Sequence, residues 1–207
     1  MTRMTSNLTL VDAGTGNLRS VQKALESLGA RVQLTSDPEV VAAAGKVVLP
    51  GVGAFGDFMQ GLRARGLEEA LVTFFRHGNP LLGICVGMQA LFESGEELGV
   101  HQGLGLLTGK VVHFPDLHPL KVPHTGWNQL TFCHPSPLSK GLNAASYAYF
   151  NHAYYCEAKE EDTTASTEYG IRFSSAIQHE NLYGVQFHPE KSQRVGLKIL
   201  ENFLKLS

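Results

Sequence analysis

A cysteine between two glycines is the residue of this sequence whose setting best suits nucleophilic catalysis. Cys85 lies in GICVG, between the apolar run PLLGI and the segment GMQALFESG. A nucleophile in a G-x-Nuc-x-G segment between a strand and a helix is typical of a nucleophile elbow, whose tight turn leaves no room for flanking side chains. The start of the helix then favours a thiolate, and the N–H of Val86 is free to donate to an oxyanion.

A histidine and a glutamate near the end of the chain supply the base and the orienting acid that a thiolate needs. His188 and Glu190 occur in HPE, directly after the apolar segment YGVQF. Pro189 disfavours helical backbone at His188, so the segment is expected to be extended, with both side chains on one side. Glu190 can then fix the tautomer of His188, as the third member of a Ser-His-Asp triad does. A lone histidine is more often a core or surface residue, but HPE together with the cysteine elbow favours a Cys-His-Glu triad.

The composition of the 207-residue chain argues against several other classes of protein. Apolar residues make up 43%, charged residues 17%, and the net charge is −2, as in an ordinary globular protein. No run of Lys or Arg indicates a nucleic-acid surface. No apolar stretch approaches the roughly 20 residues of a membrane span, and the first residues do not resemble a signal peptide. We therefore expect a cytoplasmic protein that binds neither nucleic acid nor membranes.

The remaining cysteines and the histidines do not form a recognisable metal or disulfide pattern. Cys133 and Cys156 are widely spaced from each other and from Cys85, and neither C-x-x-C nor H-E-x-x-H occurs. An odd number of cysteines without such a pair argues against a disulfide framework and against a zinc site. We expect no metal and no cofactor, and structural roles for Cys133 and Cys156.

The elements that must position these residues are alternating strands and helices in the first half of the chain. Strands are expected at residues 8–11, 31–35, 46–49 and 80–84, and helices at 17–28, between 57 and 77, and after Cys85. Gly29 suits the position after the first helix. Ser36 and Glu39 resemble a capping box for a helix with Pro38 in its first turn. Short apolar strands separated by helices indicate a parallel sheet that is covered on both faces.

The second half, residues 106–188, is predicted to be richer in strands. Its β-rich segments are KVVHF, SYAYF, FSSAI and YGVQFH, broken by Pro, Gly and Asn. A closing helix over 192–206 carries apolar residues at helical spacing. No repeat or linker divides the chain. The sequence therefore predicts one α/β domain over residues 1–207, with a central mixed, mainly parallel sheet flanked by helices.

Six blocks of the sequence resemble the class I glutamine amidotransferases, in the order found in the glutaminase subunits of imidazole glycerol phosphate synthases. They are DAGTGNLRSV, LPGVGAF, GICVGMQ, PHTGWN, YFNHAYY and QFHPEKS. Each block alone is moderately specific, but together they span residues 12–192. Ala13, Val86, Asn151 and Ala153 depart from the residues usual at their positions, and none of them belongs to the triad.

This resemblance implies a glutaminase of histidine biosynthesis. Cys85 would attack the side-chain amide of glutamine, forming a γ-glutamyl thioester and releasing ammonia. His188 would transfer the protons, and Glu190 would orient His188. The positions implied to bind the glutamine are Gln89, Glu97, Ala153 and Tyr154.

The resemblance also implies a partner chain, because this chain has no room for a synthase domain. The partner would be a (β/α)8 synthase subunit that forms a heterodimer, receives ammonia through a channel and makes imidazole glycerol phosphate. Trp127, the single tryptophan, suits an interface anchor or a core role equally well. Asn17, Tyr149 and Lys191 match family positions near the subunit contact. A glutaminase of another pathway and an inactive regulatory module are the alternatives, and the complete triad argues against the second.

The segment GVGAFG, residues 51–56, also fits the letters of a dinucleotide-binding loop. It follows the third expected strand instead of the first, and no acidic residue ends the next strand, so a nucleotide is disfavoured. In the family this segment is the oxyanion strand. Gly51 and Gly53 would let the peptide between them reorient, and the N–H of Val52 would join that of Val86 in binding the oxyanion. A carbonyl pointing inward at rest would keep the enzyme idle until its partner flips it.

Overall fold

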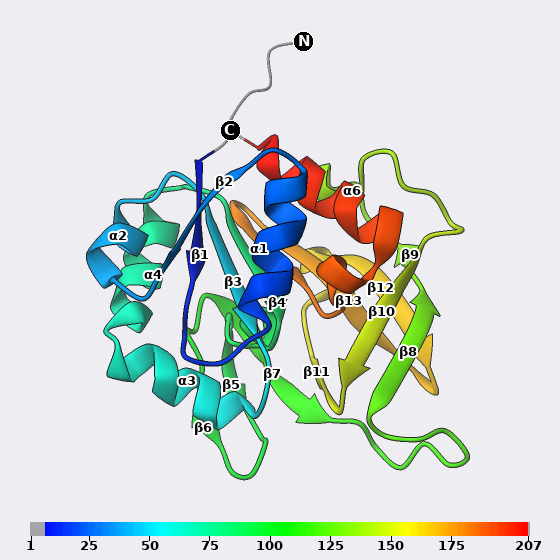
Figure 1. The fold of residues 1–207 in the computed structure, drawn as a ribbon. Coiled ribbons are helices and arrows are strands. Elements are labelled where there is room, and N and C mark those ends of the chain that lie inside the picture. The colour runs from blue at the N-terminus through cyan, green and yellow to red at the C-terminus, as the bar shows by residue number, and fades with distance from the viewer. Residues whose placement is uncertain (1–6, 207) are drawn as a thin grey trace.

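A computed structural model describes residues 7–206, and its centre is an eight-stranded sheet (Figure 1). The strand order is β2-β1-β3-β4-β14-β13-β12-β9. Neighbours from β2 to β14 are parallel, and those from β14 to β9 are antiparallel. This confirms the predicted mixed, mainly parallel sheet. The strands are β1 (Asn7–Val11), β2 (Arg31–Thr35), β3 (Val47–Gly51), β4 (Leu81–Cys85), β9 (Thr131–Phe132), β12 (Thr163–Tyr169), β13 (Ile171–His179) and β14 (Leu182–Val185).

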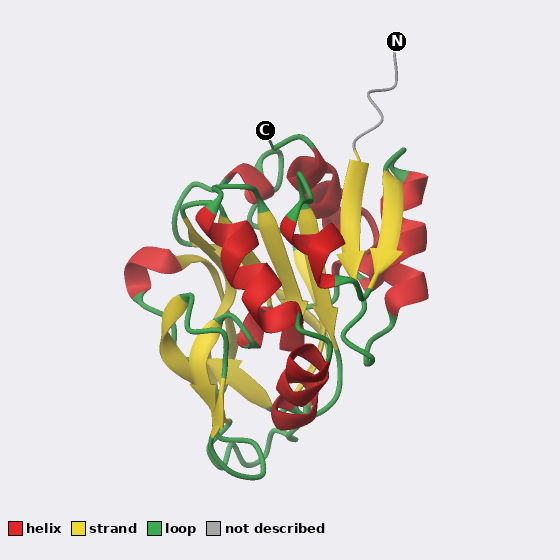
Figure 2. Cartoon of the chain, turned by 90° about the vertical axis from the view of Figure 1, so that its left-hand side faces the viewer, coloured by secondary structure: helices red, strands yellow, loops and turns green. Residues whose placement is uncertain are grey.

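Helices cover both faces of this sheet (Figure 2). On one face lie α1 (Leu18–Ser27) and α6 (Gln193–Leu204), which pack against each other. On the other face lie α2 (Pro38–Ala42), α3 (Phe55–Ala64) and α4 (Leu67–Arg76). Each longer helix turns an apolar stripe toward the sheet, which is what holds it there. In α3 the buried side chains recur at helical spacing and are Phe55, Phe58, Met59 and Leu62.

Two smaller sheets extend the β-rich half, where the sequence predicted strands but not separate sheets. One is four-stranded, in the order β11-β7-β5-β6. The other is an antiparallel pair of β8 and β10, called the ribbon below, at the right of Figure 1. Their strands are β5 (Phe92–Gly95), β6 (His101–Gln102), β7 (Leu107–His113), β8 (His124–Gln129), β10 (Tyr147–His152) and β11 (Tyr154–Cys156). The short 3₁₀ helices are η1 (Pro137–Ser139), η2 (Glu160–Asp162) and η3 (Pro189–Lys191).

Three expectations about local structure were wrong. The HPE segment is not extended throughout, because Pro189–Lys191 form η3. Helix α2 is capped by Asp37 and not by Ser36, because the carboxylate of Asp37 accepts the N–H of Glu39 at 2.9 Å. The helix after Cys85, α5 (Val86–Gln89), ends after four residues. The chain then returns as β5, whose backbone pairs with the distant strands β6 and β7 instead of continuing a helix.

One cluster of buried apolar side chains fills the space between the sheet and the helices. Within residues 7–206, no helix is both long and apolar enough to cross a membrane. The neighbours β3, β4 and β14 run parallel in the middle of the sheet, so their carboxyl ends meet at one edge. Open α/β sheets place their sites at such an edge.

Candidate active site

The backbone at Cys85 has the strained conformation of an elbow. Cys85 is the last residue of β4, and its φ of 54° and ψ of −113° are unusual for a residue other than glycine. A Cβ added to Gly87 would overlap the carbonyl oxygen of Leu49, and one added to Gly83 would lie 2.6 Å from Gly87 O. Only glycines fit at these two positions. The interpretation of GICVG as a tight strand-to-helix turn is therefore confirmed.

His188 and Glu190 reach Cys85 from the segment that follows the neighbouring strand β14. Only His188 has the extended backbone predicted for the HPE segment, because Pro189–Lys191 form the 3₁₀ helix η3. His188 follows β14, and its N–H donates to Tyr149 O of the ribbon at 2.9 Å. Its Nδ1 lies 3.0 Å from Oε1 of Glu190, and the two side chains are only 5% and 1% exposed. Cys85 and His188 line the same cavity, and interaction with Cys85 is one of the causes that raise the pKa of His188. The structure thus brings the three predicted triad residues together.

The surroundings of His188 favour its charged form. Burial by itself would lower the pKa of His188, but hydrogen bonds to Cys85 and Glu190, and attraction to their negative charges, raise it above the usual 6.5. A buried imidazolium between a carboxylate and a sulfur is a form that can give a proton to a leaving group. The arrangement is therefore suited to acid–base chemistry at the sulfur.

A cavity of about 200 Å³ opens at Cys85. The predicted residues that line it are Val52, Gly53, Cys85, Val86, Gln89, Glu97, Ala153, Tyr154 and His188. Gly51 and Glu190 do not line it. Gly51 pairs with Cys85 across β3 and β4, and Glu190 lies against the ring of His188. Three residues that the sequence did not suggest complete the wall: Pro123, Asn151 and His152.

Gln89 and Glu97 are tied into the wall of this cavity. The buried amide of Gln89 donates to Tyr154 O at 3.0 Å. Glu97 Oε2 accepts the N–H of Phe55, the first residue of α3, at 2.7 Å. A dinucleotide phosphate would need that helix start free. This contact therefore argues further against a nucleotide on GVGAFG, and it leaves a carboxylate at the cavity that suits a cationic group.

Two of the four residues predicted at a partner interface, Trp127 and Tyr149, lie on the ribbon. Trp127 is 48% exposed, so its core alternative is wrong. Its ring centroid lies 6.2 Å from that of Tyr149, and Nζ of Lys191, at the end of η3, lies 5.7 Å from the centroid of Tyr149. Asn17 precedes α1, a helix that packs against η3, and its side chain makes no capping hydrogen bond.

The other two cysteines lie outside the cavity. Cys156 is fully buried, and that burial, followed by repulsion from Cys85, raises the pKa of its thiol well above the usual value. Cys133 is partly exposed, and its sulfur lies 3.4 Å from Oγ of Ser166 and 3.1 Å from a guanidinium nitrogen of Arg172. Within residues 7–206, no group of three or more His, Cys, Asp and Glu side chains is placed to hold a metal ion.

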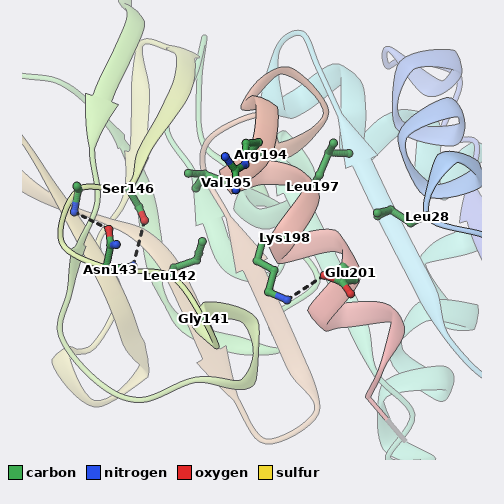
Figure 3. Close-up of a pocket in the computed structure, with 11 residues that line it drawn as sticks. Leu28, Gly141, Leu142, Asn143, Ser146, Arg194, Val195, Leu197, Lys198 and Glu201 are labelled. Carbon is green, nitrogen blue, oxygen red and sulfur yellow. Dashed lines mark hydrogen bonds and ion pairs between the residues drawn. The ribbon is translucent and has the colours of Figure 1, made fainter.

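A second, wider groove lies away from Cys85, between α6 and the loop at residues 141–146 (Figure 3). Its volume is about 730 Å³. An ion pair of 2.9 Å between Lys198 and Glu201 lies along it on α6. The groove has neither a cysteine nor a histidine in its lining, so it offers no counterpart to the chemistry at Cys85.

Comparison with known proteins agrees with this geometry. Residues 9–206 match the family described as glutamine amidotransferase class-I. The HisH subunit of imidazole glycerol phosphate synthase from Syntrophotalea carbinolica is 48% identical over 95% of this chain and 98% of its own length. The HisH subunit from Moorella thermoacetica is 50% identical over 96% of this chain and 94% of its own. The chain belongs to the HisH family of class I glutamine amidotransferases.

Solved structures of lower identity share the HisH-family fold. A putative GMP synthase protein from Thermoplasma acidophilum superposes with a TM-score of 0.72 at 21% identity, covering 98% of this chain and 94% of that one. The structure of PurLQS from Thermotoga maritima gives a TM-score of 0.77 at 17% identity, with coverage of 97% and 98%. At these identities the likeness concerns the fold alone.

Two polar residues of this HisH-family chain support the triad and were missed by the sequence analysis. Oγ of Ser192 donates to His188 O at 2.6 Å and accepts the N–H of Tyr149 at 2.9 Å, so it joins the histidine to the ribbon. Nε2 of Gln186 lies 3.8 Å from the sulfur of Cys85. Both residues occur in the block QFHPEKS, and membership of that block was the only signal that pointed to them.

Proposed function

We propose that this chain is the glutaminase subunit of an imidazole glycerol phosphate synthase, and that it hydrolyses glutamine at Cys85. The observation that carries the proposal is the buried Cys85–His188–Glu190 arrangement at the end of the cavity. The similarity to HisH subunits over nearly the full chain supports the choice of pathway.

The first half-reaction is acyl transfer to sulfur. The thiolate of Cys85 attacks the side-chain carbonyl carbon of glutamine, and the resulting oxyanion is held by the N–H groups of Val52 and Val86. His188 gives its proton to the amide nitrogen as the C–N bond breaks. Ammonia leaves, and a γ-glutamyl thioester remains on Cys85. The carboxylate of Glu190 holds the imidazole of His188 in place throughout.

The second half-reaction releases glutamate. His188, now neutral, takes a proton from a water molecule as the water oxygen attacks the thioester carbon. The C–S bond then breaks and the sulfur of Cys85 returns to its starting state. The protons lost and gained by His188 balance over the two steps.

The walls of the cavity account for recognition of the amino-acid end of glutamine. The carboxylate of Glu97 pairs with the α-ammonium group, while Gln89 and the backbone of Ala153 and Tyr154 provide the polar wall. The peptide between Gly51 and Gly53 sets the position of the Val52 N–H. An inward carbonyl at this peptide would remove one oxyanion donor and would raise the activation barrier by about 2.7–4 kcal/mol.

The ammonia is used on another chain. The partner is a (β/α)8 synthase subunit that forms a heterodimer with this chain in the cytoplasm and takes the ammonia through a channel. Its contact surface includes Asn17, Trp127, Tyr149 and Lys191. The exposed ring of Trp127 and the half-buried ring of Tyr149, which meet edge to face on the ribbon, suit such a contact, because aromatic residues are enriched at protein interfaces.

The deciding experiment is Cys85→Ala, assayed in complex with the synthase partner. Synthesis with glutamine as nitrogen donor is expected to be lost, while synthesis with added ammonia continues. Cys133→Ala is the matched control and is expected to keep both activities, because Cys133 lies outside the cavity. Glutamine-dependent synthesis that survives in Cys85→Ala would disprove the mechanism. The choice of pathway is tested by adding the nucleotide acceptor. Stimulated glutamine hydrolysis is the expected result, and no stimulation would count against a coupled synthase.

A further inference from the structure

Two buried histidines face each other across the ribbon. Their side chains link Asn128 of β8 by hydrogen bonds to the wall of the cavity at Tyr154. His124 of β8 pairs in register with His152 of β10. His124 Nδ1 lies 3.1 Å from His152 Nε2, and His152 Nδ1 lies 2.8 Å from Tyr154 O. At the other end, His124 Nε2 lies 3.3 Å from the amide nitrogen of Asn128. These four groups form one continuous chain of hydrogen bonds.

The direction of this chain is fixed at both ends. Tyr154 O can only accept, so His152 Nδ1 must carry a proton. The amide nitrogen of Asn128 also donates to Glu168 O at 2.9 Å, which turns its NH₂ group, and not its oxygen, toward His124. Donation therefore runs from Asn128 to His124, then to His152, and then to Tyr154 O. Each histidine in this order is neutral and is protonated on Nδ1.

The carbonyl at the end of the chain belongs to the wall of the cavity. Tyr154 O receives a second hydrogen bond from Nε2 of Gln89, at 3.0 Å. The same nitrogen lies 3.2 Å from Oε1 of Gln186, whose own amide nitrogen lies near the sulfur of Cys85. The Tyr154 carbonyl is thus held from two sides, and its position also sets that of Gln89.

We infer that His124 and His152 are positioning residues of the glutamine site: His124 sets the tautomer of His152, and His152 holds the backbone wall at Tyr154. This inference rests on the proposed glutaminase function. His124 does not line the cavity, so its influence on glutamine passes through His152. Without the His124 N–H, His152 can carry its proton on Nε2 instead. Its bare Nδ1 would then face Tyr154 O, and the wall would lose one of its two donors.

The packing around the two rings keeps them in this arrangement. The ring of His124 stacks on Phe150 and Tyr169, with centroid distances of 4.8 and 4.0 Å. Burial lowers the pKa of His124 to about 4 and is the main cause that lowers that of His152 to about 3. Both rings therefore remain neutral near pH 7, as the one-directional chain requires.

The test compares two substitutions of His124 in the complex with the synthase partner. His124→Phe keeps a ring for stacking but removes the donor to His152. We expect KM for glutamine to rise roughly 2- to 12-fold, the factor expected from one neutral hydrogen bond, and kcat to change less. His124→Asn places an amide nitrogen where Nδ1 was, so it is expected to restore KM to within about twofold of the wild type.

A packing control distinguishes the loss of the His124–His152 hydrogen bond from a general loss of packing in the aromatic cluster. Phe173→Leu alters the same aromatic cluster, since the ring of Phe173 lies 5.9 Å from that of His124 and 5.1 Å from that of His152. It leaves the hydrogen-bonded chain intact and is expected to lower the melting temperature without the rise in KM. A KM unchanged in His124→Phe, or raised equally in Phe173→Leu, would overturn the inference.

The tautomers give a readout that does not depend on catalysis. In protein labelled with ¹⁵N-histidine, His124 and His152 are expected to show a protonated Nδ1 and a bare Nε2 at pH 7. A wild-type His152 protonated on Nε2 would refute the inference even if a variant failed to fold. Wild-type protein that does not hydrolyse glutamine would instead refute the proposed function, and the NMR result would still decide the tautomers.

Discussion

The substitution Glu190→Gln isolates the role of the carboxylate beside His188. It keeps the size of the side chain but removes the negative charge of Glu190. That charge lies 3.0 Å from Nδ1 of His188, and both side chains are almost fully buried. A unit charge pair at about 4 Å with an effective dielectric constant of 20 is worth about 4 kcal/mol. If it were lost from the transition state alone, this energy would correspond to roughly a thousandfold in rate, which is the upper limit of the charge effect. An amide can also turn its NH₂ group to the ring and favour the wrong tautomer, as in Ser-His-Asp enzymes.

The measurement is steady-state hydrolysis of glutamine by the complex with the synthase partner. We expect kcat to fall by about three orders of magnitude. KM is expected to change little, because Glu190 does not line the cavity. Synthesis from added ammonia is the internal control and should not change. A kcat within threefold of the wild type would refute the assignment of Glu190 as the orienting group.

The same substitution should affect stability much less than activity. Glu190 Oε2 is buried and has no hydrogen-bond partner among the described residues, so the charged group is poorly solvated in the folded state. Because the pKa of His188 is raised, its contribution to stability is full below 6.5 and is lost as pH rises toward the raised value. Glu190→Gln should therefore lose less stability than the wild type between pH 7 and pH 10, measured by chemical unfolding.

Three further predictions concern the fold. Gly87→Ala should abolish glutamine hydrolysis and lower the melting temperature, because its Cβ would overlap Leu49 O; wild-type activity would contradict the close packing at the elbow. Lys46 donates to the carbonyls of Leu204, the last residue of α6, and of Leu206 just after it, so Lys46→Met should lower the free energy of unfolding by about 1–3 kcal/mol, and an unchanged denaturation midpoint would count against it. Because burial lowers the pKa of His124 to about 4, the wild type should lose stability as pH falls below 6.5; His124→Phe should flatten that loss in unfolding curves recorded from pH 7 to pH 4.

Much of the fold, and the residues that meet at Cys85, could be predicted from local sequence. The apolar runs before Gly51 and Cys85 gave strand ends close to those of β3 and β4. The glycines around Cys85 and the proline after His188 act on the nearest backbone, so their consequences could be worked out without knowing the fold. The position of Ser36 was misleading because Asp37, directly before Pro38, is an equally good capping residue.

What the sequence did not reveal depends on distant partners. The sequence of Phe92–Gly95 favours the continuation of a helix, but in the structure this segment is a strand because its backbone pairs with β6 and β7. The relation of His124 to His152 exists only because β8 and β10 pair in one register, across 28 positions of the chain. Side-chain periodicity contains no information about such a register when both strands are short and partly polar.

The place of β14 in the sheet has a consequence for how the protein is made. β14 is the last strand in the chain, yet it lies beside β4 near the middle of the sheet. A growing chain that has reached residue 150 on the ribosome already contains the cysteine elbow, but one long side of β4 still lacks its neighbour. Unpaired strand edges of this kind invite aggregation. Cys85 is thus synthesised about half a chain length before His188, and the two meet only when β14 inserts.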